Sequence, residues 1–110
     1  MIMPRKRTER KVKRYEVNWA VKKLNGKLIE LAQLLDISSL GTRLEANQGL
    51  APRNLVEILV DLPGEGKEVK LSGQVMWMRP LVESPGRFQM WVKFFNANWE
   101  IDRLVRAGKI

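Results

Sequence analysis

Residues 36–41 read Asp-Ile-Ser-Ser-Leu-Gly, and the rest of the chain is organised around them. They follow the apolar run 28–35 and lead into residues 42–45, so we interpret them as a strand end, a polar turn and the start of another strand. Asp and Ser bond to nearby backbone groups in turns, and Gly adopts backbone geometries that other residues avoid. The stretch therefore predicts a turn that gathers a carboxylate, two hydroxyls and accessible backbone on one small surface.

Before this turn, alternation predicts a strand from Tyr15 onward. Val17, Trp19 and Val21 alternate with Glu16, Asn18 and Ala20, and a strong hairpin signal, Asn-Gly, follows at residues 25–26.

Residues 27–38 fit two periods. Helical spacing fits Leu28, Leu31, Leu34 and Leu35, whereas one face of a long strand fits Ile29, Leu31, Leu35 and Ile37. The preceding Asn-Gly turn favours a hairpin, so we predict one long strand.

After the turn, residues 42–46, 55–62, 69–78 and 88–95 are expected to form strands, with Leu44 inward and Trp77 on the face of Val75. Residues 98–107 predict a short helix, because Asn98 suits a cap and Ile101 and Leu104 make an apolar face. The chain is therefore predicted to be mainly all-β, a six-stranded antiparallel barrel with a short C-terminal helix.

Composition excludes several kinds of site. The chain of 110 residues has no Cys and no His, which removes disulfides, thiol chemistry, the commonest metal ligand and the usual general base. We therefore expect no enzyme, no metal site and no cofactor. There is neither an apolar run of membrane-spanning length nor a signal-peptide core, so we expect a cytoplasmic protein.

The net charge of +8 is concentrated at the N-terminus. Residues 1–27 contain ten basic and two acidic residues, and residues 28–110 contain ten of each. Such a segment attracts phosphate, although a solvated tail is the simpler alternative. Because residues 1–14 lack periodicity, we predict a flexible basic arm at 1–14 and a barrel with its helix at 15–110.

Arg10 and Arg14 give this arm the spacing RxxxR. Arginine offers a planar fork of donors that grips phosphate or a guanine edge, and residues four apart in an extended chain span about 13 Å. This spacing and the DxSxxG pattern of residues 36–41 are each weak signals alone. Together, in this order and within a predicted barrel, they resemble the PilZ domain family. Residues 71–77, 86–95 and 99–104 also resemble that family's late strands and terminal helix.

The resemblance implies a receptor for cyclic di-GMP, a bacterial second messenger with two guanines and two phosphates. It implies that Arg10 and Arg14 clamp phosphates and guanine edges. It further implies that Asp36 accepts hydrogen bonds from guanine N–H groups, that Ser38 bonds the guanine or a phosphate, and that Gly41 keeps the turn open. On spacing alone, Lys6 and Arg7 are additional candidates.

We expect the arm to become ordered over the nucleotide and an unidentified downstream protein effector to recognise the new surface; monomer and homodimer both stay open. A barrel binding single-stranded nucleic acid is less favoured, because residues 28–110 carry no excess charge and the pattern shows no exposed aromatic platform. A PilZ-like protein-interaction module that does not bind nucleotide is the third interpretation.

The tryptophans are expected to serve mainly the core, although Trp99 lies on a surface side of the helix with Arg103 and Arg106.

Overall fold

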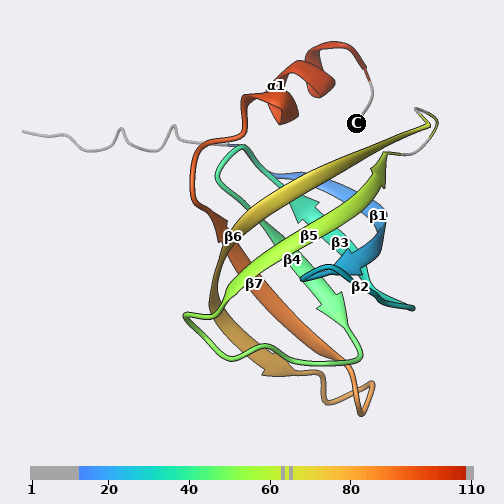
Figure 1. Ribbon diagram of the computed structural model, residues 1–110, viewed down its shortest axis with the longest axis vertical. Helices are drawn as coiled ribbons and strands as arrows, with labels where there is room; N and C mark the ends of the chain where they lie inside the picture. Colours follow the sequence, from blue (N-terminus) through green and yellow to red (C-terminus); the bar gives the residue numbers. More distant parts are fainter. Residues whose placement is uncertain (1–12, 63, 65, 109–110) are drawn as a thin grey trace, which may run out of the picture.

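The computed structural model describes residues 13–62, 64 and 66–108, which form strands and one short helix (Figure 1). The strands are β1 (Tyr15–Leu24), β2 (Lys27–Leu28), β3 (Gln33–Ile37), β4 (Gly41–Ala46), β5 (Leu55–Leu62), β6 (Lys67–Pro80) and β7 (Phe88–Phe94), and the helix is α1 (Trp99–Arg106).

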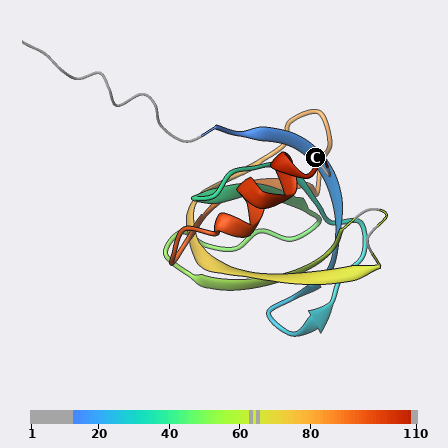
Figure 2. The ribbon, with the colours of Figure 1, turned by 90° about the horizontal axis from the view of Figure 1, so that it is seen from above.

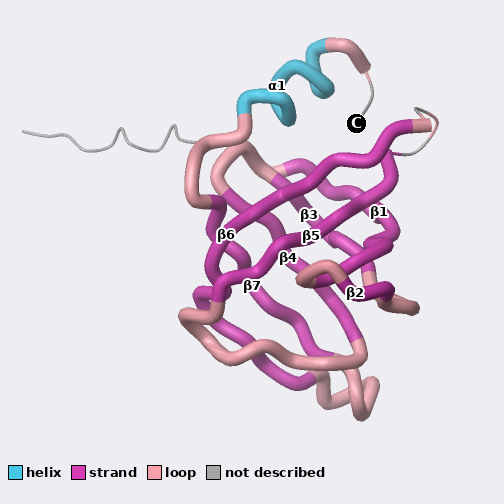
Figure 3. The backbone as a smooth tube through the Cα atoms, in the orientation of Figure 1, coloured by secondary structure: helices cyan, strands magenta, loops and turns pink. Residues whose placement is uncertain are grey.

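Six of these strands close into an antiparallel barrel. Their order is β1-β3-β4-β7-β6-β5, and β5 pairs back with β1 through Val21↔Val60 and Leu24↔Ile58. The seventh strand, β2, only extends the hairpin at the edge of β1 (Figure 3). Closure pairs the backbone groups that an open sheet leaves at its edges. The predicted six-stranded barrel with a C-terminal helix is thus confirmed, with one small strand added.

The core lies inside the barrel and under α1. Leu34, Leu44 and Val92, from three neighbouring strands, are fully buried. Ile101 and Leu104 of α1 are also buried, and the helix lies across one end of the barrel (Figure 2). This end of the barrel also carries the turn between β3 and β4 (Figure 1).

Residues 27–38 do not form the single long strand that the sequence predicts. The chain bends after β2, and Leu31 has a φ of 59° and is 73% exposed. Ala32 and Leu34 are buried there. Of the four residues predicted to share one face, Ile37 is fully buried, whereas Leu35 is only half-buried and Leu31 is exposed. The bend is held by Arg87, whose guanidinium donates to the Leu31 carbonyl. The spacing of apolar residues does not reveal that a distant side chain will hold one residue in the left-handed conformation.

A bulge then decides which way Asp36 faces. Leu34 pairs with Leu44 and Asp36 pairs with Arg43, so Leu35 is the extra residue on β3. Leu34 points into the core, and unbroken alternation would point Asp36 inward as well. The extra residue changes the phase, which places Asp36 on the outer face of the barrel with Arg43.

Candidate functional site

Ser38 builds the turn between β3 and β4. Its backbone N–H donates to the Gly41 carbonyl at 2.8 Å. Its hydroxyl oxygen accepts from the N–H groups of Leu40, at 3.1 Å, and Gly41, at 3.2 Å. A serine that accepts from backbone donors two and three residues ahead fixes a tight turn. The buried Ser38 therefore shapes the surface on which the other polar groups of the turn lie.

Gly41, the first residue of β4, is required by packing. A Cβ on Gly41 would lie 2.5 Å from the Val92 carbonyl oxygen and 2.7 Å from Cζ2 of Trp91. The glycine thus allows the Trp91 indole on β7 to lie directly against the start of β4. This close contact joins the turn to the neighbouring strand.

Asp36 and Arg43 form an ion pair beside the turn. Arg43 Nη2 lies 2.8 Å from Asp36 Oδ2, and the aspartate side chain is only 6% exposed. The Thr42 hydroxyl donates to the Asp36 carbonyl at 2.7 Å, which fixes the backbone at the same point. Glu16 faces Asp36 across the β1–β3 ladder, so Arg43 compensates a locally acidic row.

Trp91 connects this pair to the basic segment. It lies opposite Arg43 in the β4–β7 ladder, and the guanidinium carbon of Arg14 lies 4.4 Å from the centre of its ring. A cation at this distance over an indole face is attracted by the ring. Trp91 therefore lies between Arg14 of the RxxxR motif and Gly41 of the DxSxxG motif, and Asp36 is linked to the same indole through Arg43. We call the outer surface formed by Arg14, Asp36, Arg43 and Trp91 the outer wall.

The other basic candidates, Lys6, Arg7 and Arg10, lie outside the described residues.

Aromatic residues on the outside of the barrel differ from the prediction. Trp19 is buried and Trp99 is 67% exposed, both as predicted, but Trp77 is 40% exposed. A bulge between Val75 and Trp77 turns Trp77 outward, next to Trp91 in the β6–β7 ladder. The expectation that Trp77 shares the face of Val75 is therefore wrong, and the outside of the barrel carries an exposed indole that the alternation pattern does not reveal.

A second carboxylate pair lies one row further along the same sheet. Arg87 Nη2 lies 2.9 Å from Glu45 Oε2, and both side chains are mostly buried. Burial raises the pKa of Glu45, but hydrogen bonds from Gln89 and Arg87 outweigh it and hold the pKa below its ordinary value. This pair also anchors the bend at Leu31 through the same guanidinium, so its role is structural.

The turn is bonded to the segment that leads into α1. Asn98 N–H donates to the Ser39 carbonyl at 2.6 Å, and Phe94 N–H donates to the Leu40 carbonyl at 2.8 Å. Asn98 also caps α1 as predicted, because its Oδ1 accepts from Glu100 N–H at 3.1 Å. The turn is therefore hydrogen-bonded directly to the residue that caps the helix.

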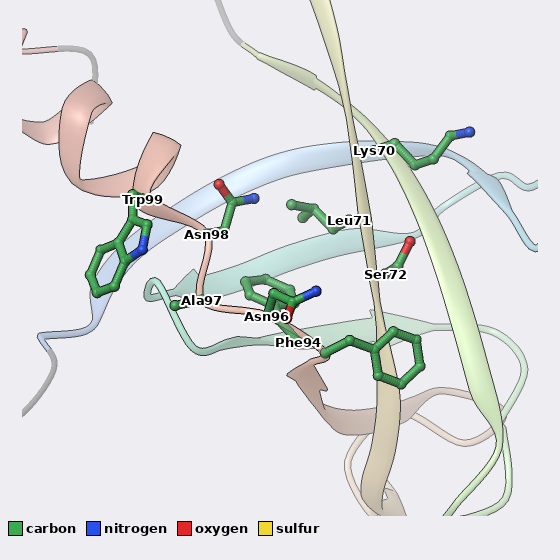
Figure 4. Close-up of a pocket in the computed structure, with 9 residues that line it drawn as sticks. Lys70, Leu71, Ser72, Phe94, Asn96, Ala97, Asn98 and Trp99 are labelled. Carbon is green, nitrogen blue, oxygen red and sulfur yellow. The ribbon is translucent and has the colours of Figure 1, made fainter.

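A pocket of about 320 Å³ lies on the other side of this connecting segment (Figure 4). Lys70, Ser72, Asn96 and Asn98 supply its polar groups. Asp36 and Arg14 do not line this pocket, so it is separate from the outer wall.

Arg43 and Trp91 were not predicted as part of the site. Arg43 does have a sequence signal, because pairing outward from the turn brings residue 37 opposite 42 and residue 36 opposite 43. Trp91 has none, because its place beside Arg43 depends on how β7 pairs with β4 across the chain.

Comparison with known proteins gives one family. The family model described as PilZ domain matches residues 4–107. No curated protein matches the chain. Among the residues that the structure describes, no helix has the length and apolar character needed to cross a membrane.

Proposed function

The chain belongs to the PilZ domain family, whose members are receptor domains for cyclic di-GMP, and we propose that it binds this nucleotide on the outer wall. The observation that carries the proposal is the meeting of the two motifs. Arg14 stacks on Trp91, and Trp91 packs against Gly41 beside the Asp36–Arg43 pair. A cation, an aromatic ring and a carboxylate on one surface match a phosphate, a base and its N–H edge.

Each group has a task in this proposal. Asp36 accepts from the N–H groups of a guanine, because an ionised carboxylate only accepts hydrogen bonds. Arg14 and Arg10 hold phosphates or the guanine O6 and N7 atoms. Ser38 presents the turn, and its N–H and hydroxyl are already bonded within that turn. The proposed task of Ser38 is therefore to shape the surface more than to bond the nucleotide.

Binding would bring the basic arm, residues 1–14, over the wall. Two arginines four residues apart can reach opposite ends of a ligand with two phosphates, since the span is about 13 Å in an extended chain. Ordering a chain segment costs entropy, so we expect moderate affinity together with a large change of surface. The bonds from Ser39 and Leu40 to the segment before α1 give that change a route to the helix. A downstream protein would then recognise the arm and the exposed Trp99.

A second candidate, binding of single-stranded nucleic acid, is favoured by one observation. Trp91 and Trp77 lie side by side on the outside of the barrel, and the guanidinium carbon of Arg79 is 5.6 Å from the centre of the Trp77 ring. Neighbouring indoles with arginines above them resemble the stacking surfaces on which bases lie. Against it stands the balanced charge of residues 28–110.

Calorimetric titration separates the two. We expect the full chain to bind cyclic di-GMP with a saturable heat. Arg14→Ala and Asp36→Ala should each weaken binding by about tenfold or more, since each removes a charge-assisted hydrogen bond. Lys22→Ala is the matched control, because it removes one positive charge that pairs with Glu68 on β6.

Absence of heat and of chemical-shift change at high micromolar cyclic di-GMP would disprove the receptor proposal. Nucleic-acid binding would instead weaken steeply with salt, increase with strand length and be indifferent to cyclic di-GMP.

A further inference from the structure

Arg43 supplies the positive charge beside the Asp36 carboxylate. Its Nη2 atom is 2.8 Å from Asp36 Oδ2, and the Arg43 side chain is 34% exposed while that of Asp36 is 6% exposed. A buried carboxylate needs a cation beside it, because its desolvation is costly otherwise. Arg43 supplies that cation from the facing position of the β3–β4 ladder.

The pair is joined by one end only. Arginine can hold both oxygens of a carboxylate with two parallel bonds. Here Asp36 Oδ1 and Arg43 Nε are both buried without a hydrogen-bond partner among residues 13–62, 64 and 66–108. The Thr42 hydroxyl holds the Asp36 backbone at the same time. The contact therefore fixes the carboxylate in one orientation and leaves Oδ1 as a buried acceptor that bonds to none of the described residues.

We propose that Arg43 is a positioning residue that sets the selectivity of the site for guanine over adenine; this rests on the proposed function. Guanine presents two neighbouring N–H donors, at N1 and N2, on its Watson–Crick edge. Adenine has an acceptor nitrogen at N1 instead, beside its N6 amino group. When the nucleotide reaches this carboxylate, the unpartnered Oδ1 accepts from the guanine N–H edge and repels the adenine nitrogen. Without Arg43 the carboxylate is free to rotate, and this rotation weakens the discrimination between guanine and adenine.

The test compares affinities for cyclic di-GMP and cyclic di-AMP across a double-mutant cycle of Arg43→Gln and Asp36→Asn in the full chain. We expect Arg43→Gln to weaken cyclic di-GMP binding by about tenfold and to lower the guanine-to-adenine ratio of affinities. In the Asp36→Asn background the same change should alter binding by less than about twofold, because Arg43 acts through Asp36. Arg43→Lys keeps the charge but loses the planar fork, so it should fall between wild type and Arg43→Gln.

Arg87→Gln is the matched control, because it removes an arginine from another mostly buried carboxylate pair in the same sheet. It should lower stability and leave the ratio of affinities unchanged. Thermal unfolding of every variant separates loss of fold from loss of selectivity, and Arg43→Lys gives the result if Arg43→Gln does not fold.

Two results overturn the role of Arg43 while the receptor function stands. One is wild-type affinity and selectivity in Arg43→Gln. The other is an equal loss in both backgrounds, which would mean that Arg43 acts independently of Asp36. A wild-type chain that binds neither nucleotide overturns the receptor function and this role together.

Discussion

Gly41→Ala is expected to damage the fold and the site together. The added methyl carbon would lie 2.5 Å from the Val92 carbonyl oxygen and 2.7 Å from Cζ2 of Trp91. Comfortable carbon contacts begin at about 3.5 Å, so β4 or the indole must move by about 1 Å. Because one neighbour is backbone in a paired strand, rotating a side chain cannot remove the whole clash. Overpacking of this kind costs about 1–3 kcal/mol of a total stability of about 5–15 kcal/mol.

Urea unfolding and calorimetric titration measure the two effects separately. Gly41→Ala should lower the unfolding free energy by the amount above. It should also weaken nucleotide binding, because the shifted indole no longer supports Arg14. Gly26→Ala is the control. Gly26 has a φ of 82° in the β1–β2 hairpin, and a methyl carbon added there would have no atom within 4 Å. This substitution therefore adds only backbone strain, of about 1 kcal/mol. If Gly41→Ala is within about 0.5 kcal/mol of wild type, the close contact of β4 with Trp91 is refuted.

Three further changes test single contacts. Leu31→Asn should raise the unfolding free energy by up to about 1 kcal/mol in urea, because Asn tolerates the left-handed backbone better and the exposed leucine loses little; a destabilised variant would contradict this. Asn98→Ala should cost about 1 kcal/mol and reduce α1 helicity by circular dichroism, since it removes the cap; unchanged helicity would refute the cap. The pKa of Glu45 is lower in the folded chain than in the unfolded chain, where it is about 4.3. The ionised Glu45 therefore stabilises the fold fully above the unfolded pKa, and this contribution is lost as the pH falls through the pKa of the folded state. The difference in unfolding free energy between wild type and Glu45→Gln should therefore shrink from pH 7 to pH 3, and a constant difference would contradict it.

Much of the barrel follows from local sequence. Alternation in residues 15–24 and 88–94, and the Val, Ile and Leu content of residues 55–62, predict strands that the structure contains. The Asn-Gly hairpin has positive φ at both positions, as such a turn requires. The errors arise where a distant group overrides the local pattern. Leu31 is held in a left-handed bend by Arg87, and the bulge before Trp77 reverses the face that alternation assigns.

Only part of the candidate site could be predicted from the sequence. Asp36, Ser38 and Gly41 stand in one turn, so their proximity follows from adjacency alone. Arg43 follows from the hairpin register, because pairing outward from the turn places residue 43 opposite Asp36 before the bulge at Leu35 begins. Trp91 lies far downstream of Arg43, and only closure of the barrel through β7 brings it to the wall.

The most direct test of cyclic di-GMP binding at the outer wall is a two-dimensional amide and indole NMR titration of the full chain. The expected shifts are concentrated at Ser38, Leu40, Gly41 and the Trp91 indole, and smaller at Asn98, which is bonded to the turn. Saturable shifts confined to the pocket beside Lys70 and Ser72, or no shifts at high micromolar nucleotide, would contradict it.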